Sequence, residues 1–109
     1  MVECSANLDH VFKSLADATR RDILSRVSKK SLSISTLAES YEMSFAAIAK
    51  HVSVLEAAKL ITKRREGKRQ IISAVPKTIE TALTHLEQYE KLWQERFDAL
   101  ENLLQEDEL

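Results

Sequence analysis

Residues 43–61, MSFAAIAKHVSVLEAAKLI, and residues 62–75, TKRREGKRQIISAV, decide the fold predicted for this chain. The first stretch is rich in small residues and has one apolar edge with spacings of three and four, which predicts a short helix. The second has β-branched and long side chains on either side of Gly67, the only glycine, which predicts a two-stranded hairpin with a basic tip. A short helix that can enter a groove, beside a basic hairpin, is typical of a winged helix-turn-helix that grips duplex DNA.

A helix-turn-helix is predicted to begin just before the first stretch. Ser35 is expected to cap a short helix that reaches Tyr41, and a turn over residues 42–44 then leads to a second helix capped by Ser44. The apolar side chains expected to hold the two helices together are Leu37, Ala38, Ile48, Val52 and Leu55.

Further helices are predicted on both sides of this motif. One covers residues 8–16, and Asp17 is a suitable N-cap for another over residues 18–27. Pro76 fits the first turn of a last helix that runs to about residue 104. With one glycine and one proline among 109 residues, long helices with few tight turns are expected. The predicted fold class is therefore mainly α with a small β-hairpin wing, in the order α-α-α-α-β-β-α.

The net charge of −1 conceals an uneven distribution. Residues 1–75 carry 13 lysines and arginines against 8 acidic residues, whereas residues 76–109 carry 3 against 9. Residues 44–75 alone carry 7 basic and 2 acidic side chains. A phosphate backbone meets this local field rather than the total charge, so double-stranded DNA is the expected partner.

The candidate DNA contacts lie on the outward face of the second helix and on the hairpin. Ser44 directs free N–H groups of a helix N-terminus toward phosphate, Lys50 can reach a guanine or a phosphate, and His51 can donate to a phosphate. The full set is Ser44, Phe45, Ala46, Lys50, His51, Ser53, Lys63, Arg64, Arg65, Lys68 and Arg69.

Three segments together resemble the ArsR/SmtB-type family of bacterial winged-helix regulators, in its metal-independent branch. They are FKSLADATRRDIL at 12–24, LAESYEMSFAAIAKHVSVLEAAKLI at 37–61 with KRREGKRQ at 63–70, and YEKLWQERFDALENLL at 89–104. The resemblance implies a cytoplasmic homodimer that pairs through its first and last helices and represses transcription at a palindromic operator. It divides a single domain, 1–109, into an N-terminal dimerisation helix (1–16), the helix-turn-helix (35–57), the β-wing (60–75) and a C-terminal dimerisation helix (76–105). The dimer residues it implies are Leu8, Val11, Phe12, Trp93, Phe97, Leu100 and Leu104.

The chain departs from the family pattern at four positions. Ala18 replaces a proline at a helix start, and Ala49 and Ser53 replace a serine and a basic residue of the recognition helix, which removes polar contacts to DNA. Lys59 stands where a glycine usually follows that helix, so Lys59 is expected at positive φ at a cost of about 1 kcal/mol.

Other classes of protein fit the sequence less well. No metal or cofactor is expected, because the third helix has no Cys or His and the scattered His10, His85 and Glu87 have ordinary surface explanations. A single glycine leaves no phosphate-binding loop, and no catalytic constellation is present, so an enzyme is not expected. Cys4 is read as a free thiol, and no membrane span or signal peptide is predicted. The inducer is not identified. The alternative is a winged-helix dimer that binds protein instead of DNA.

Overall fold

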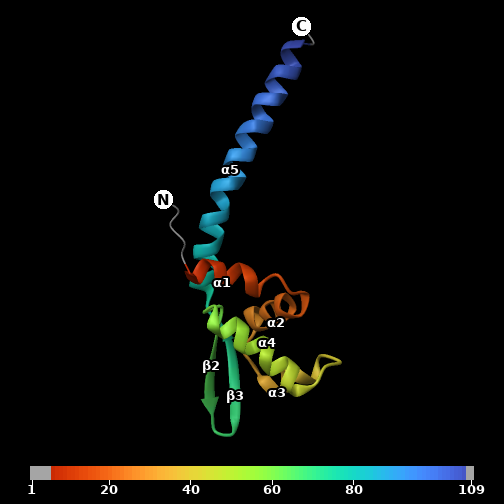
Figure 1. Cartoon of the computed structure of the whole chain (residues 1–109), viewed down its shortest axis with the longest axis vertical. Coiled ribbons are helices and arrows are strands. Elements are labelled where there is room, and N and C mark those ends of the chain that lie inside the picture. Colours follow the sequence, from red (N-terminus) through yellow and green to blue (C-terminus); the bar gives the residue numbers. More distant parts are fainter. Residues whose placement is uncertain (1–5, 108–109) are drawn as a thin grey trace. The chain divides into compact units, whose positions relative to one another are not determined.

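The structure is a computed structural model that describes residues 6–107 (Figure 1). The helices and strands, in chain order, are α1 (Ala6–Ser14), α2 (Ala18–Lys29), β1 (Leu32–Ser33), α3 (Ile34–Glu39), α4 (Phe45–Ala57), β2 (Ile61–Glu66), β3 (Arg69–Ala74) and α5 (Pro76–Asp107). This arrangement confirms the predicted mainly helical fold with a β-hairpin wing. The chain divides into a compact unit that ends at Ile79 and a second that begins at Glu80.

Caps in the sequence set two of the helix starts as predicted. The Asp17 side chain accepts a hydrogen bond from the Arg20 backbone N–H, and α2 begins directly after it. The Ser44 side chain accepts from the Ala47 N–H, and α4 begins at Phe45. Each cap satisfies one of the N–H groups that a helix start leaves without an intrahelical partner.

The segment between α2 and α4 differs from the prediction. Ser33, not Ser35, caps α3, because its hydroxyl accepts from the Thr36 N–H at 3.2 Å. Ser35 lies inside the helix, and α3 ends too early to include Tyr41. Both serines precede Leu37 and both are residue types that cap helices, so the sequence alone does not distinguish them.

A third strand was absent from the prediction. Residues 32 and 33 form β1, which pairs antiparallel with β3 through Leu32–Ile72 and Ser33–Ile71. The sheet order is therefore β1-β3-β2, with the hairpin strand β3 in the centre. Two residues are too few to show the period-two alternation by which a strand is detected in a sequence.

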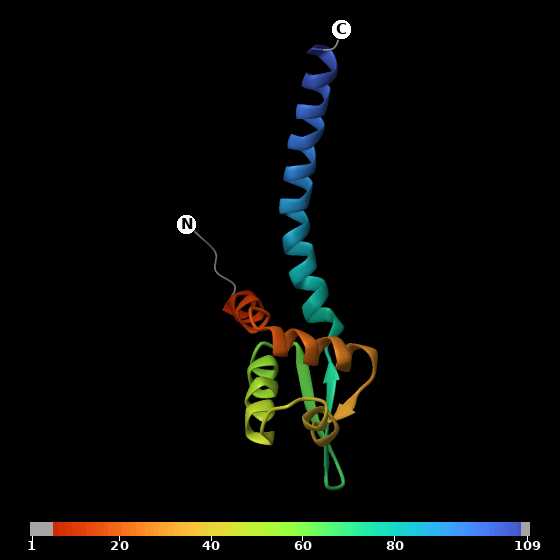
Figure 2. The same ribbon diagram turned by 90° about the vertical axis from the view of Figure 1, so that its right-hand side faces the viewer.

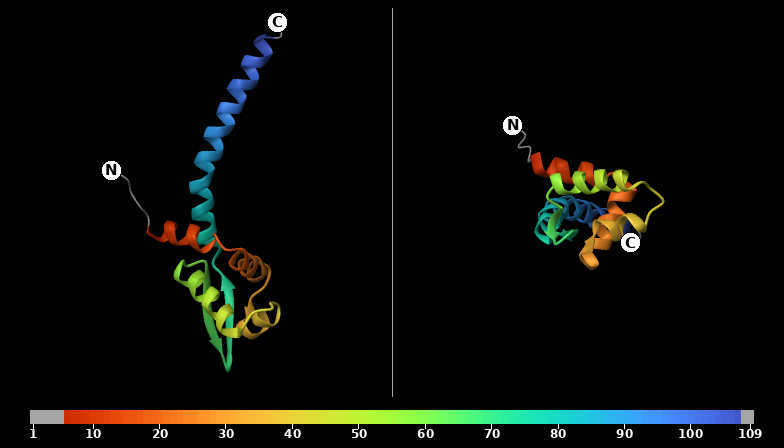
Figure 3. Two further views of the ribbon diagram at one scale, coloured as in Figure 1. Left: turned by 45° about the vertical axis from the view of Figure 1, so that its right-hand side comes forward. Right: turned by 90° about the horizontal axis from the view of Figure 1, so that it is seen from below.

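The core of the first unit lies between the helices and this sheet. Ile48, Val52 and Leu55 of α4 are fully buried, as their spacing predicted. They share the interior with Ile23 of α2 and Leu37 of α3, which are equally buried. Helices α1 and α4 lie side by side (Figure 3), and the tip of the β2–β3 hairpin extends beyond α3 and α4 (Figure 2). The hairpin tip and the outer face of α4 are therefore left for a partner.

Helix α4 ends in a Schellman motif. The Leu60 N–H donates to the Leu55 carbonyl at 3.1 Å, and the Lys59 N–H donates to the Glu56 carbonyl at 2.9 Å. Lys59 has φ of 62°, which confirms the positive φ predicted there, and Leu55 and Leu60 are both fully buried. The motif therefore joins α4 to β2 at a fixed angle, although a lysine occupies the position that glycine prefers.

The second unit consists of α5 from Glu80 onward. Its exposed apolar side chains recur mostly every three or four residues, with Trp93 and Phe97 each more than half exposed. Tyr89, also exposed, lies one helical turn from Trp93. The exposed apolar residues of α5 are Leu83, Leu86, Tyr89, Leu92, Trp93, Phe97, Leu100, Leu103 and Leu104.

Candidate nucleic-acid interface

The outer face of α4 contains most of the predicted helix contacts. Phe45, Ala46, Lys50 and Ser53 are exposed, together with the capping residue Ser44. This face is opposite to the buried edge of α4, as a 3.6-residue period requires. It therefore offers a short apolar first turn, followed by an amino group and a hydroxyl.

A cleft with basic walls opens between the start of α4 and the wing. We call it the cationic cleft; its lining residues are Ile34, Ser35, Phe45, Arg65, Lys68, Arg69 and Gln70. It contains three basic side chains and no acidic one. Within residues 6–107, neither Lys68 nor Arg69 has a side-chain hydrogen bond or ion pair. These cations are free to bind an anion, and a phosphodiester is the anion that a helix-turn-helix meets.

The two faces of the hairpin are not equivalent. Successive side chains of a strand point to opposite faces, so Arg65, paired with Gln70, faces the cationic cleft. Arg64 points the other way, bonds to Glu66 at 3.0 Å, and lines a separate hollow. The remaining wing cation, Lys63, lies 3.5 Å from Glu56 of α4. Of the five predicted wing cations, Arg65, Lys68 and Arg69 therefore line the cleft beside Phe45, and Arg69 also lines the hollow of Arg64.

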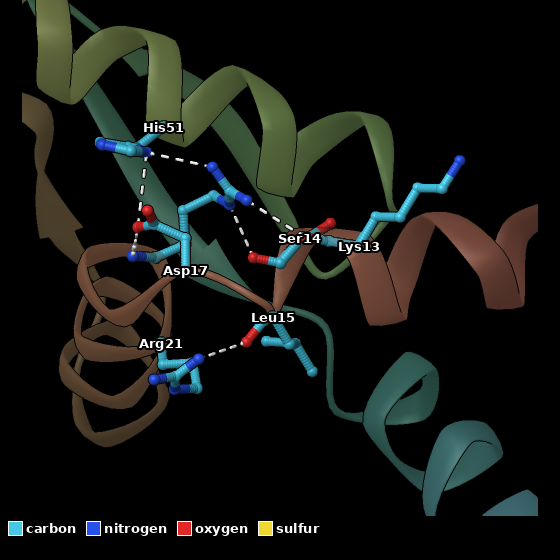
Figure 4. A network of polar contacts seen from close by, with 7 residues as sticks. Lys13, Ser14, Leu15, Asp17, Arg21 and His51 are labelled. Carbon is cyan, nitrogen blue, oxygen red and sulfur yellow. Dashed lines mark hydrogen bonds and ion pairs between the residues drawn. The ribbon is translucent and has the colours of Figure 1, made fainter.

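His51 lies in a network that connects α4 to the start of α2 (Figure 4). Its Nδ1 atom lies 3.4 Å from Arg20 Nη1 and 3.9 Å from Asp17 Oδ2. These two contacts join the imidazole of α4 to the N-cap and the first turn of α2. The side chain is 19% exposed. His51 therefore chiefly fixes α4 to the start of α2, and only a small part of its side chain is open to a phosphate.

Arg20 and Arg21 complete this network at the end of α1, a role that the sequence analysis did not assign. Arg20 donates to the carbonyl of Ser14 at 2.6 Å and to that of Lys13 at 3.1 Å, and Arg21 donates to Leu15 at 2.7 Å (Figure 4). Carbonyls at a helix C-terminus lack intrahelical partners, and cations there also oppose the helix dipole. Arg20 therefore joins α1, α2 and α4 through one guanidinium.

The turn between α3 and α4 is anchored by Tyr41. Its hydroxyl donates to Asp22 of α2, and the Arg26 guanidinium lies 5.3 Å from the centre of its ring. Burial and the neighbouring carboxylate raise the pKa of Tyr41 to about 12. The hydrogen bond from Tyr41 and that from Arg26 hold the pKa of the Asp22 carboxyl below its ordinary value. Tyr41 thus remains a protonated donor, and the turn stays attached to α2.

Asparagine in place of Asp17 is expected to lower stability near neutral pH and to matter less in acid. The hydrogen bond from the Arg20 N–H, and then attraction to Arg20 and His51, hold the pKa of Asp17 below its ordinary value. A carboxylate whose pKa is depressed by folding stabilises above its unfolded pKa and loses this effect as the pH falls through the folded pKa. Asparagine keeps the cap but not the charge. The urea midpoints of the two proteins should therefore converge between about pH 6 and pH 3; equal midpoints at pH 6 would contradict this.

The predicted dimer residues differ in how far they are exposed. Phe12 of α1 is 38% exposed, and the four on α5 are more than half exposed, so each offers surface to a partner. Leu8 is half-buried. Val11 is 1% exposed and belongs to the interior of the chain itself, so it is corrected to a core residue.

The structure also bears on metals, the cysteine and membranes. In the described part of the chain, no three His, Cys, Asp or Glu side chains gather as they would around a metal ion. Cys4 lies outside the described residues. No helix within residues 6–107 combines the length and apolar character needed to span a bilayer.

Comparison with known proteins places this geometry in a family. The helix-turn-helix domain family matches residues 15–64. An HTH-type transcriptional regulator of Bacillus subtilis, YuzN, is 41% identical over 76 residues, which are 62% of this chain and 82% of that protein. The transcriptional repressor SdpR of the same organism is 32% identical over 60 residues, covering 55% of this chain and 67% of SdpR. An ArsR-like transcriptional regulator from Rhodococcus sp. RHA1 superposes with a TM-score of 0.74 and is 31% identical, covering 90% of this chain and 92% of that one.

These similarities, with the fold and the exposed helix of the motif, define a DNA-binding transcriptional regulator. The chain belongs to the ArsR-like family of helix-turn-helix transcriptional regulators. This family is a class of regulators and not a class of enzymes.

Proposed function

We propose that the chain is a homodimeric repressor that binds a palindromic operator with two copies of α4 and two wings. The observation that carries the proposal is the cationic cleft, where Arg65, Lys68 and Arg69 lie beside the first turn of α4 and no acidic residue is part of the lining. The three cations of the cleft then supply salt-dependent affinity, and Phe45, Ala46, Lys50 and Ser53 supply sequence discrimination. SdpR is a transcriptional repressor, which supports the same direction of control here.

The proposed dimer rests on α5. A row of large apolar side chains over several helical turns, with Trp93 and Phe97 among them, exceeds what a helix of a monomer exposes to water. A second copy of the same helix would cover it, with Phe12 of α1 as a further contact. Two-fold symmetry would set the two α4 helices about 34 Å apart, one turn of DNA. The cytoplasm is the location we propose, because chromosomal DNA is the proposed ligand.

Fluorescence anisotropy of labelled DNA tests the proposal. Duplex from just upstream of the protein's own gene is compared with unrelated duplex of equal length, from about 50 to 200 mM salt. Tight, salt-sensitive binding that prefers the upstream duplex supports an operator-binding regulator. Absence of binding to both duplexes by a folded dimer would refute the proposal and favour the alternative of a protein-binding module.

Single substitutions in the wing are expected to separate its two faces. Alanine at Arg65 or at Lys68 should weaken binding to upstream and unrelated DNA alike and lower the slope of log K against log salt by about 1, because one phosphate contact is lost. Alanine at Arg64 is the matched control, since Arg64 faces away from the cationic cleft and pairs with Glu66. Equal slopes for all three variants would refute the assignment of the cleft.

A further inference from the structure

The first turn of α4 exposes carbon where a DNA-reading helix usually exposes hydrogen-bonding groups. Phe45 is the first residue of α4 and is 54% exposed, and Ala46 beside it is also exposed. Ala49, one turn further on, is half-buried. None of these three side chains can donate or accept a hydrogen bond at a base edge.

The position of Phe45 is fixed by the structure around it. Ser44 caps α4 immediately before it, which holds the helix start in place. On the other side Phe45 forms part of the wall of the cationic cleft, with Arg65, Arg69 and Gln70. Phe45 and those arginines line the same cleft, so a phosphate bound there would lie near the ring of Phe45.

We propose that Phe45 contributes to operator specificity by packing its ring against the C5-methyl group of a thymine in the major groove. This inference rests on the proposed function. Base edges in the major groove present donors and acceptors to a protein, and the thymine methyl is their one apolar group. An apolar first turn can therefore gain affinity by covering this methyl. Lys50 and Ser53, further along α4, remain the polar contacts.

A duplex that lacks only these methyl groups tests the inference. The upstream duplex is synthesised with thymine and again with uracil at every thymine position of both strands; uracil keeps the same hydrogen-bonding groups and loses the methyl. Synthetic DNA contains no 5-methylcytosine, so thymine is its sole source of C5-methyl groups. Wild-type protein is expected to bind the uracil duplex roughly 4- to 15-fold more weakly, as one or two methyl groups lose their cover.

Two variants assign this loss to Phe45. Phe45→Ala should bind the thymine duplex more weakly than wild type does and should bind the two duplexes with nearly equal affinity. Lys50→Ala is the control: it weakens binding to both duplexes and keeps the wild-type ratio between them. Both positions are exposed, so circular dichroism of each variant is expected to match that of the wild type.

The outcomes separate this inference from the proposed function. If wild type binds the two duplexes equally, or if Phe45→Ala keeps the wild-type ratio, the inference is wrong while operator binding stands. If wild type binds the upstream thymine duplex no more tightly than unrelated DNA, the proposed function fails and the inference fails with it.

Discussion

Alanine in place of Leu55 is expected to lower the free energy of unfolding by about 2–5 kcal/mol. Leu55 is fully buried, and it lies on the buried edge of α4 with Ile48 and Val52. Its loss removes apolar contact area and leaves a cavity that the rigid neighbours fill only in part. Leu60, whose N–H donates to the Leu55 carbonyl in the Schellman motif, is equally buried.

Urea unfolding followed by circular dichroism measures this change, at one fixed protein concentration because dimerisation would contribute to stability. Ser53→Ala on the exposed face of the same helix is the control and should stay within about 0.5 kcal/mol of wild type. A Leu55→Ala protein within about 1 kcal/mol of wild type would mean that the site collapses around the smaller side chain.

Alanine in place of Trp93 is expected to raise the dissociation constant of the proposed dimer by about 30-fold or more. Trp93 is 56% exposed in the single chain. The centre of its ring lies 6.3 Å from that of Phe97 and 5.7 Å from the Arg96 guanidinium. Large aromatic side chains with such neighbours dominate the energetics of many interfaces. Affinity for the operator should fall together with dimerisation.

Sedimentation at a series of protein concentrations, from nanomolar upward, measures the dimer directly. Glu95→Ala is the matched control, because Glu95 is exposed on the opposite side of α5 and should leave the dissociation constant unchanged. A Trp93→Ala protein that remains as tight a dimer as wild type would place the interface elsewhere.

Local chemistry explains which parts of the structure the sequence could predict. Asp17, Ser44 and Gly67 act through their own hydrogen bonds or φ angles, so the starts of α2 and α4 and the hairpin tip followed from a few neighbouring residues. The positive φ of Lys59 was instead implied by the family resemblance, in which a glycine usually occupies this position.

Contacts between distant residues explain what the sequence did not predict. The pairing of β1 with β3 joins residues about 40 positions apart in the sequence. The contact of Arg20 with His51 spans two helices and follows no helical spacing. In the hairpin, the basic composition was evident, but which cations share the cationic cleft depends on the register Arg65–Gln70.

The two residues that end the Schellman motif of α4 also bind the start of α5. The carbonyl of Lys59 accepts a hydrogen bond from the Thr78 hydroxyl at 2.6 Å, and the carbonyl of Leu60 accepts from the Val75 N–H at 2.9 Å. The residues that follow α4 and the start of α5 are thus joined by two hydrogen bonds. The start of α5 can therefore separate from the end of α4 only if both of these bonds break.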